Sequence, residues 1–245
     1  MDESSPVKRT STHATRLIGI VGLTSVTLIV IAAFVSPPLW SAPGESSSAA
    51  HVAAYLQANR GRTLASLYIY GLGMGLFLCF AAGLWSWLRQ AESAPQSLSA
   101  AFAFGAIALA TLVLASFATA GVASYRPQSP ALAVSLSDLT FGLLALSGIP
   151  TAICLGAYAA LVLRQRHLPA WTAWLAVLAV TAHLVVAASF MSHGSVLSLE
   201  GAVNVAVPAT FFAWILATSA VLLAGTSRRS RASGGHLAVV GSSSR

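Results

Sequence analysis

Six long runs of apolar residues recur along this 245-residue chain, and each is long enough to cross a lipid bilayer as a helix. About 20 apolar residues span about 30 Å of hydrocarbon at 1.5 Å per residue. Because lipid offers the backbone no hydrogen-bond partners, such runs fold as helices. We therefore predict an all-α fold, a polytopic transmembrane bundle of six helices, at about 17–35, 64–88, 98–123, 130–163, 170–190 and 203–224.

The composition agrees with a membrane protein. Hydrophobic residues make up 56% of the chain and charged residues only 8%, whereas soluble domains carry about 25% charged residues. The first run, 17–35, is longer than the core of a signal peptide, so we expect an uncleaved helix. We predict one membrane domain over 17–225, preceded by a polar tail at 1–16 and followed by a disordered tail at 226–245.

The positive charges are distributed unequally between the two sides of this predicted topology. Of the 13 Lys and Arg residues, three lie in the N-terminal tail, one in loop 89–96, two in turn 164–168 and four in the C-terminal tail. The opposite side carries only Arg60, Arg62 and Arg126. By the positive-inside rule, we expect both termini in the cytoplasm. We expect the protein to reside in the plasma membrane of the cell. The net charge of +7 is explained by this topology, so we predict no nucleic-acid partner.

The run 130–163 differs from the others because it contains an acidic residue, Asp138, and an internal proline, Pro150. Ser129 and Pro130 form a favourable helix start. A helix of this length would extend about 50 Å, which exceeds the thickness of the hydrocarbon. Pro150 removes one backbone hydrogen bond, and we expect it to kink the helix.

Five polar or ionisable residues are expected in the outer half of the membrane domain, and together they suggest an outward-facing polar pocket. At the helical rise, Asp138 lies roughly 37 Å and His183 roughly 20 Å from the cytoplasmic ends of their helices. A carboxylate and an imidazole at this depth could relay a proton or bind a cation. The predicted pocket comprises Asp138, His183, Tyr68, Tyr70 and Asn204.

A structural interpretation of the same residues competes with the pocket, and the sequence favours it. Asp138 would pair with Arg126, Arg60 or Arg62 near the headgroups, and His183 would bond to a hydroxyl or a backbone carbonyl. Because Asp138 lies near the interface rather than the membrane centre, its charge costs little there.

Catalytic and metal-binding patterns are weak in this sequence. Rhomboid intramembrane proteases, which are similar six-helix proteins, carry a GxSG serine on the fourth helix and a histidine on the sixth. Here Ser147 precedes Gly148, but the first glycine of that motif is missing and His183 lies on the fifth run. The outer-side residues His51, His193 and Glu200 show no metal-ligand spacing with Asp138 or His183. The sequence predicts no catalytic group, metal or cofactor.

Gly71 and Gly75 form a small-xxx-small pair in the second run, with Gly73 between them. Such pairs let another helix backbone approach closely. The partner could be a helix of the same chain or of a second molecule, and packing within the chain is the more frequent arrangement. Cys79 and Cys154 lie in apolar runs and are interpreted as small hydrophobic residues.

Three segments resemble an uncharacterised family of six-helix integral membrane proteins of actinobacteria. These are HVAAYLQANRGR at 51–62, LWSWLRQAE at 84–92 and LPAWTAWLAV at 168–177. The resemblance extends over most of residues 15–225. The family has no assigned activity, so it implies the six-helix topology and no chemistry.

These observations favour a non-enzymatic membrane protein that acts by binding or assembly. Its expected partners are the lipid bilayer and either another membrane protein or a second copy of the chain. A small-solute or proton-coupled transporter that uses the outward-facing pocket is the alternative. An intramembrane enzyme is the least favoured hypothesis, because no catalytic constellation is recognisable.

Overall fold

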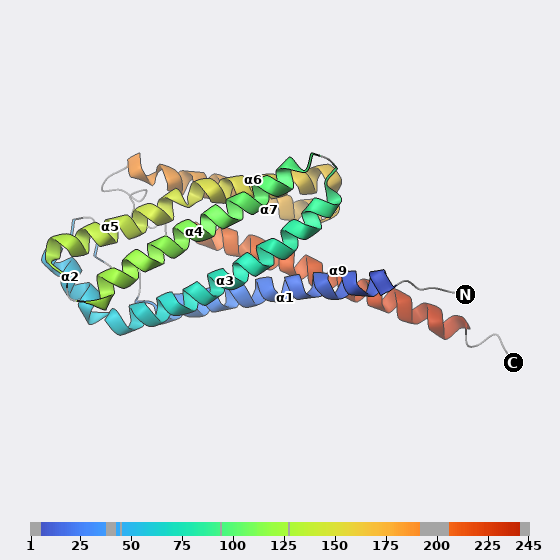
Figure 1. The fold of residues 1–245 in the computed structure, drawn as a ribbon, viewed down its shortest axis with the longest axis horizontal. Helices are drawn as coiled ribbons and strands as arrows, with labels where there is room; N and C mark the ends of the chain where they lie inside the picture. The colour runs from blue at the N-terminus through green and yellow to red at the C-terminus, as the bar shows by residue number, and fades with distance from the viewer. Residues whose placement is uncertain are drawn as a thin grey trace.

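The computed structural model describes residues 6–37, 43–44, 46–93, 95–126, 128–191 and 206–240, and all secondary structure in this part of the chain is helical (Figure 1). The elements are α1 Pro6–Val35, α2 Ala49–Ala58, α3 Arg60–Ala91, α4 Ser97–Tyr125, α5 Pro130–Leu146, α6 Gly148–Gln165, α7 Ala170–Ala187, the 3-10 helix η2 Ala188–Met191 and α9 Pro208–Val240. Six segments are long and apolar enough to span a membrane: His13–Val35, Arg60–Ala91, Ser97–Tyr125, Pro130–Gln165, Ala170–Met191 and Pro208–Gly225. The predicted all-α fold with six membrane-spanning helices is confirmed.

Helix boundaries differ from the predictions mainly at the two ends of the chain. α1 begins at Pro6 and therefore includes most of the predicted N-terminal tail. α9 begins at Pro208 rather than at residue 203, and residues 203–205 lie outside the described part of the chain. It continues to Val240, where the sequence predicts disorder. The division into one membrane domain and two tails stays a prediction.

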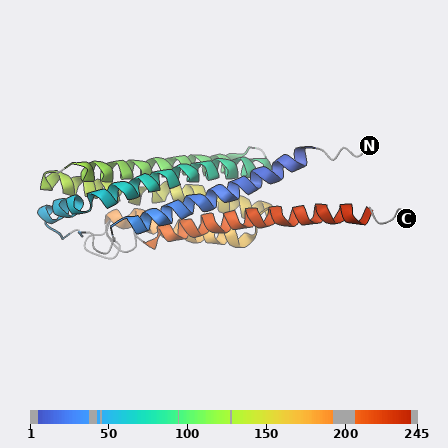
Figure 2. The ribbon, with the colours of Figure 1, turned by 90° about the horizontal axis from the view of Figure 1, so that it is seen from below.

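The spans lie side by side along the long axis of the molecule (Figures 1 and 2). α1 packs against α3 and α9, α4 packs against α3, α5 and α6, and α7 packs against α6 and α9. The start of α1, the end of α9 and the connections at 92–96 and 166–169 lie at one end, which we call the basic end. The short helix α2 lies at the opposite end, which we call the α2 end.

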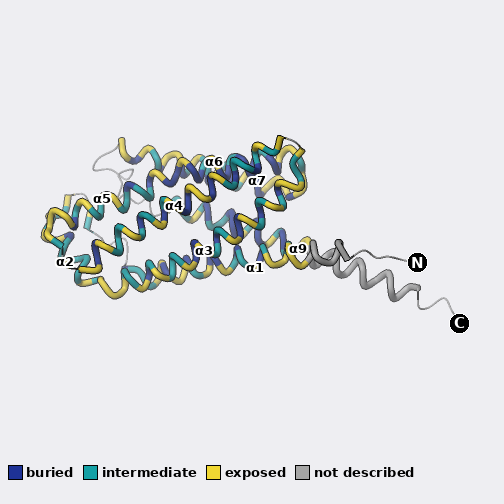
Figure 3. Tube along the Cα trace, viewed as in Figure 1, coloured by how far each residue is buried: buried dark blue, intermediate teal, exposed yellow. Residues whose placement is uncertain are grey.

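The core forms where apolar side chains recur on one face of each span. On α3 the buried positions follow the helical repeat, and Figure 3 shows such buried stripes alternating with exposed ones. The largest fully buried side chain is Trp214 of α9. Its ring lies 5.1 Å from that of Tyr158, 5.8 Å from Phe211, 6.0 Å from Phe80 and 6.5 Å from Phe102. This aromatic cluster joins α3, α4, α6 and α9.

Small residues allow the helices to approach closely elsewhere in the bundle. A Cβ placed on Gly105 of α4 would lie 2.7 Å from the backbone nitrogen of Cys154 and 2.9 Å from the carbonyl oxygen of Pro150. The backbones of α4 and α6 therefore touch at this point. Lipid supplies no hydrophobic drive between helices, so close packing of this kind stabilises the bundle.

The fourth span is divided at Ser147 into α5 and α6, three residues before Pro150, where the sequence predicts a kink. Pro150 has no N–H, so it cannot donate to the carbonyl of Leu146 one turn earlier. The Ser147 hydroxyl donates to the carbonyl oxygen of Leu144 at 2.6 Å. The break thus lies within the membrane span rather than at its end.

Candidate functional site

The two tyrosines of the predicted pocket lie on different sides of α3. The Tyr68 side chain is 70% exposed. Tyr70 is partly buried, and its ring lies 5.2 Å from that of Phe117 on α4. Asn204 lies outside the described residues. Within the described part of the chain, no hydrogen bond or ring contact joins any two of the pocket residues, so the outward-facing pocket stays a prediction.

Asp138 lies exposed on α5, and none of the arginines suggested as its partners is paired with it among the described residues. The guanidinium groups of Arg60 and Arg126 lie 5.6 Å and 5.7 Å from the ring of Tyr125. Arg62 donates to the carbonyl oxygens of Val35 and Ser36 at 3.1 Å and 2.8 Å. Arg62 therefore binds the end of α1, and Arg60 and Arg126 lie against the last residue of α4.

His183 lies buried on α7, as its position in an apolar run predicts. Its Nδ1 lies 2.8 Å from the carbonyl oxygen of Ala179. Since a carbonyl can only accept, Nδ1 carries the proton and donates. The ring lies 6.1 Å from that of Phe211. A Cβ on Gly148 would overlap the His183 carbonyl oxygen, so the helix break at Ser147 lies directly against α7 at this residue.

The arrangement at Ser147 does not resemble an activated nucleophile. Its hydroxyl already donates to the carbonyl oxygen of Leu144, and the imidazole of His183 bonds to its own helix. Catalysis by serine needs a base within hydrogen-bond reach of the hydroxyl, and no hydrogen bond joins Ser147 to a histidine among the described residues. His193 and Glu200 lie outside the described residues. In the described ranges, no three His, Cys, Asp or Glu side chains cluster.

The glycine that packs within the chain is Gly73, which lies between the two glycines singled out from the sequence. A Cβ on Gly73 would lie 2.7 Å from Ile29 of α1, and its carbonyl oxygen accepts a hydrogen bond of 2.8 Å from Ser25. A Cβ on Gly71 or Gly75 would meet no described atom within 4 Å. Packing of Gly71 and Gly75 against a second molecule stays a prediction.

A chain of buried hydroxyls crosses from α9 to α7, and the sequence interpretation did not identify it. Tyr158 donates to Thr172 at 2.9 Å, and Thr172 donates to the carbonyl oxygen of Pro169 at 2.9 Å. The hydroxyl of Thr218 lies 3.3 Å from that of Tyr158. All three side chains are fully buried. Tyr158 is the only tyrosine in its run, which is the one signal that could have indicated a polar contact there.

Glu92 caps α4 from the preceding loop, and the sequence interpretation missed this role too. Its two carboxylate oxygens accept from the backbone N–H groups of Leu98 and Ser99 at 3.0 Å and 2.8 Å. Partial desolvation raises the pKa of Glu92, but these donors and the charge of Arg164 outweigh it and hold the pKa below its ordinary value. The carboxylate therefore stabilises the positive N-terminal end of the α4 dipole.

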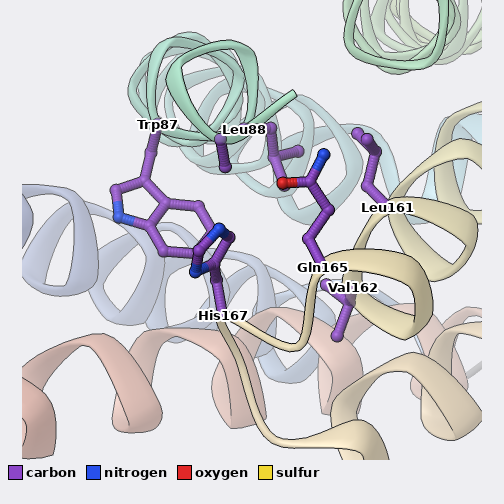
Figure 4. Close-up of a pocket in the computed structure, with 7 residues that line it drawn as sticks. Trp87, Leu88, Leu161, Val162, Gln165 and His167 are labelled. Carbon is purple, nitrogen blue, oxygen red and sulfur yellow. The ribbon is translucent and has the colours of Figure 1, made fainter. Parts of the chain in front are cut away.

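Two adjoining cavities lie at the basic end of the bundle. The larger is a hollow of about 570 Å³, bordered by Glu92, Arg164 and Gln165 together with Ser93, Ser97 and Leu98. The smaller, of about 10 Å³, lies between α3 and α6 beneath Trp87 and His167, whose rings are 6.1 Å apart (Figure 4). The larger hollow is of the size that binds small molecules or lipid headgroups.

We expect the contribution of Glu92 to stability to depend on pH. Because its pKa is lowered in the folded state, the stabilisation is fully present above the unfolded pKa of about 4.3 and is lost as the pH falls through the folded value. Glu92→Gln should lower stability by about 1 kcal/mol at pH 7, and the difference should vanish at low pH. Thermal unfolding of both proteins in detergent across this pH range measures it, and a difference that does not change with pH would refute the charged cap.

Comparison with known proteins identifies no family for this chain, because no family model, no curated protein and no solved structure matches it.

Proposed function

We propose that this multi-pass membrane protein acts by binding and assembly rather than by catalysis. A helix of a second copy packs on the side of α3 that carries Gly71 and Gly75, which we call the outward face of α3. In this proposal it is a bacterial plasma-membrane protein of the actinobacterial six-helix type, with both termini in the cytoplasm. The unequal distribution of Lys and Arg supports this orientation.

The observation that carries the proposal is the position of Gly71 and Gly75. Neither has a described neighbour within 4 Å of a Cβ, although the span they occupy is otherwise closely packed through Gly73. Glycines in lipid-facing positions lower helix propensity, so a chain gains nothing from them unless another helix covers them. A small-xxx-small pair allows the closest approach of two helices in lipid.

The thiol of Cys79 provides a direct test, because it lies exposed on α3 one turn beyond Gly75, whereas Cys154 is buried. We expect a short bifunctional thiol reagent to crosslink the full-length protein into dimers in native membranes. Gly75→Leu should abolish this dimer, because its side chain separates the two helices. Leu178→Ala is the control, since it shortens an exposed side chain on α7, away from α3, and should leave crosslinking intact.

Cys79→Ser must remove the crosslinked band, which shows that the band arises at this face. A monomer in membranes and in mild detergent, with no crosslink from Cys79, would contradict self-assembly through α3. A crosslink of Cys79 to a different polypeptide would instead point to a membrane protein partner at the same face.

A transporter is the second candidate, and the helix break at Ser147 is the observation that favours it. Discontinuous helices with ionisable neighbours form the substrate sites of many transporters, and Gly148 lies against His183. Proton uptake into vesicles that contain the protein should then be lost in His183→Ala and Asp138→Asn. Unchanged uptake in both variants would rule out this candidate.

A further inference from the structure

We propose that the hollow at the basic end binds the phosphate headgroup of an anionic membrane lipid. The site is separate from the outward face of α3 and does not depend on self-assembly. Its central group is Arg164, at the end of α6, which borders the hollow of about 570 Å³.

Among the arginines of this end whose side chains the structure describes, Arg164 is the one that borders the hollow. It also makes no hydrogen bond or ring contact with a described residue. Arg89 donates to Gln96 at 3.0 Å, and its guanidinium lies 5.7 Å from the ring of Trp85. For Arg164, no hydrogen bond, ion pair or ring contact occurs within the described part of the chain. Its guanidinium is therefore free to donate two parallel hydrogen bonds, which matches a phosphate group.

Glu92 lies on the same wall and its charge interacts with that of Arg164, but it forms no ion pair with the guanidinium among the described residues. Both of its oxygens accept from backbone N–H groups of α4, at 3.0 Å and 2.8 Å. Its negative charge is thus directed at the helix terminus, as a cap. The remaining polar groups on the wall, the amide of Gln165 and the hydroxyls of Ser93 and Ser97, can donate to phosphate oxygens.

The level of the hollow identifies the source of the phosphate as a lipid. Its walls come from the ends of three membrane spans. Two of these spans end here, at Ala91 and Gln165, and the third begins here, at Ser97. Trp85 and Trp87 lie one to two turns below on α3, where aromatic residues mark the interface. Leu98 adds an apolar border against which an acyl chain can lie. Hollows between helices at this level of a membrane suit lipid headgroups, and the guanidinium of Arg164 favours an anionic one.

The test is binding of phosphatidylglycerol and phosphatidylcholine to the full-length protein in detergent, measured lipid by lipid with native mass spectrometry. We expect phosphatidylglycerol to bind more tightly, and Arg164→Gln to weaken its binding at least about tenfold. Arg166→Gln is the matched control, because Arg166 is exposed two residues away and does not border the hollow. It should change binding less than about twofold.

Further arms keep the result decisive. Arg164→Lys retains the charge but not the planar fork, so its binding should fall between wild type and Arg164→Gln; it also serves if Arg164→Gln does not fold. Soluble glycerol phosphate should bind far more weakly than the lipid. Equal effects of the two glutamine variants, no preference for the anionic lipid, or equal binding of glycerol phosphate would each overturn the proposal.

Discussion

Replacing Gly148 by alanine should destabilise the protein by about 1–3 kcal/mol. The new Cβ would overlap the carbonyl oxygen of His183 and would lie 3.2 Å from its carbonyl carbon and 3.3 Å from the Cβ of Ala187. Two of these atoms belong to the backbone of α7, so no side chain can rotate away to make room. The α6 and α7 helices must separate, and packing is lost along their length. Chemical or thermal unfolding in a mild detergent measures the effect.

Gly156→Ala is the matched control for this change, because Gly156 also lies on α6. It adds the same methyl group to a membrane span, but no described atom lies within 4 Å of it. Since alanine also favours the helix by about 1 kcal/mol over glycine, stability should stay the same or rise slightly. Equal destabilisation by the two substitutions would mean that α6 and α7 are not in close contact at Gly148.

Truncation of Trp214 to alanine should cost about 3–5 kcal/mol. The indole is fully buried and contacts four aromatic rings, those of Phe80, Phe102, Tyr158 and Phe211. Its N–H interacts with the hydroxyl of Tyr158 without forming a well-aligned hydrogen bond in the described structure, so the loss reports mainly packing. A cavity of indole size in a rigid cluster cannot be filled by small movements of its neighbours.

Trp174→Ala provides the comparison, because Trp174 is 61% exposed on α7. Its removal should change the free energy of unfolding by less than about 0.5 kcal/mol. If the two variants unfold at the same denaturant concentration, the aromatic cluster around Trp214 does not hold the bundle together.

The spans could be predicted from the sequence because lipid forces every long apolar run into a helix. The break near Pro150 could be predicted for an equally local reason, the missing N–H of one residue. These features depend only on residues close together in the chain. No knowledge of how one helix faces another is required.

The partners of single residues could not be predicted, because the apolar residues surround each helix and leave its rotation undetermined. Gly71, Gly73 and Gly75 are alike in sequence, yet only Gly73 faces α1. Counting residues along the helices predicts the depths of Asp138 and His183 in the membrane. The side of its helix that each residue presents to the bundle depends on how α5 and α7 pack. Glu92 caps a helix across a loop of several residues, a spacing that no short capping motif describes.

The adjacency of α1 and α9 has a consequence for biogenesis. Gly22 of α1 contacts Ser219 of α9, yet the ribosome adds Ser219 about 200 residues after Gly22, which takes roughly 10–40 s at about 5–20 residues per second. During this interval the first helix waits in the membrane with one face uncovered. The ring of helices closes only once α9 has been synthesised, so a nascent chain arrested before α9 presents that uncovered face to the insertion and quality-control machinery of the cell.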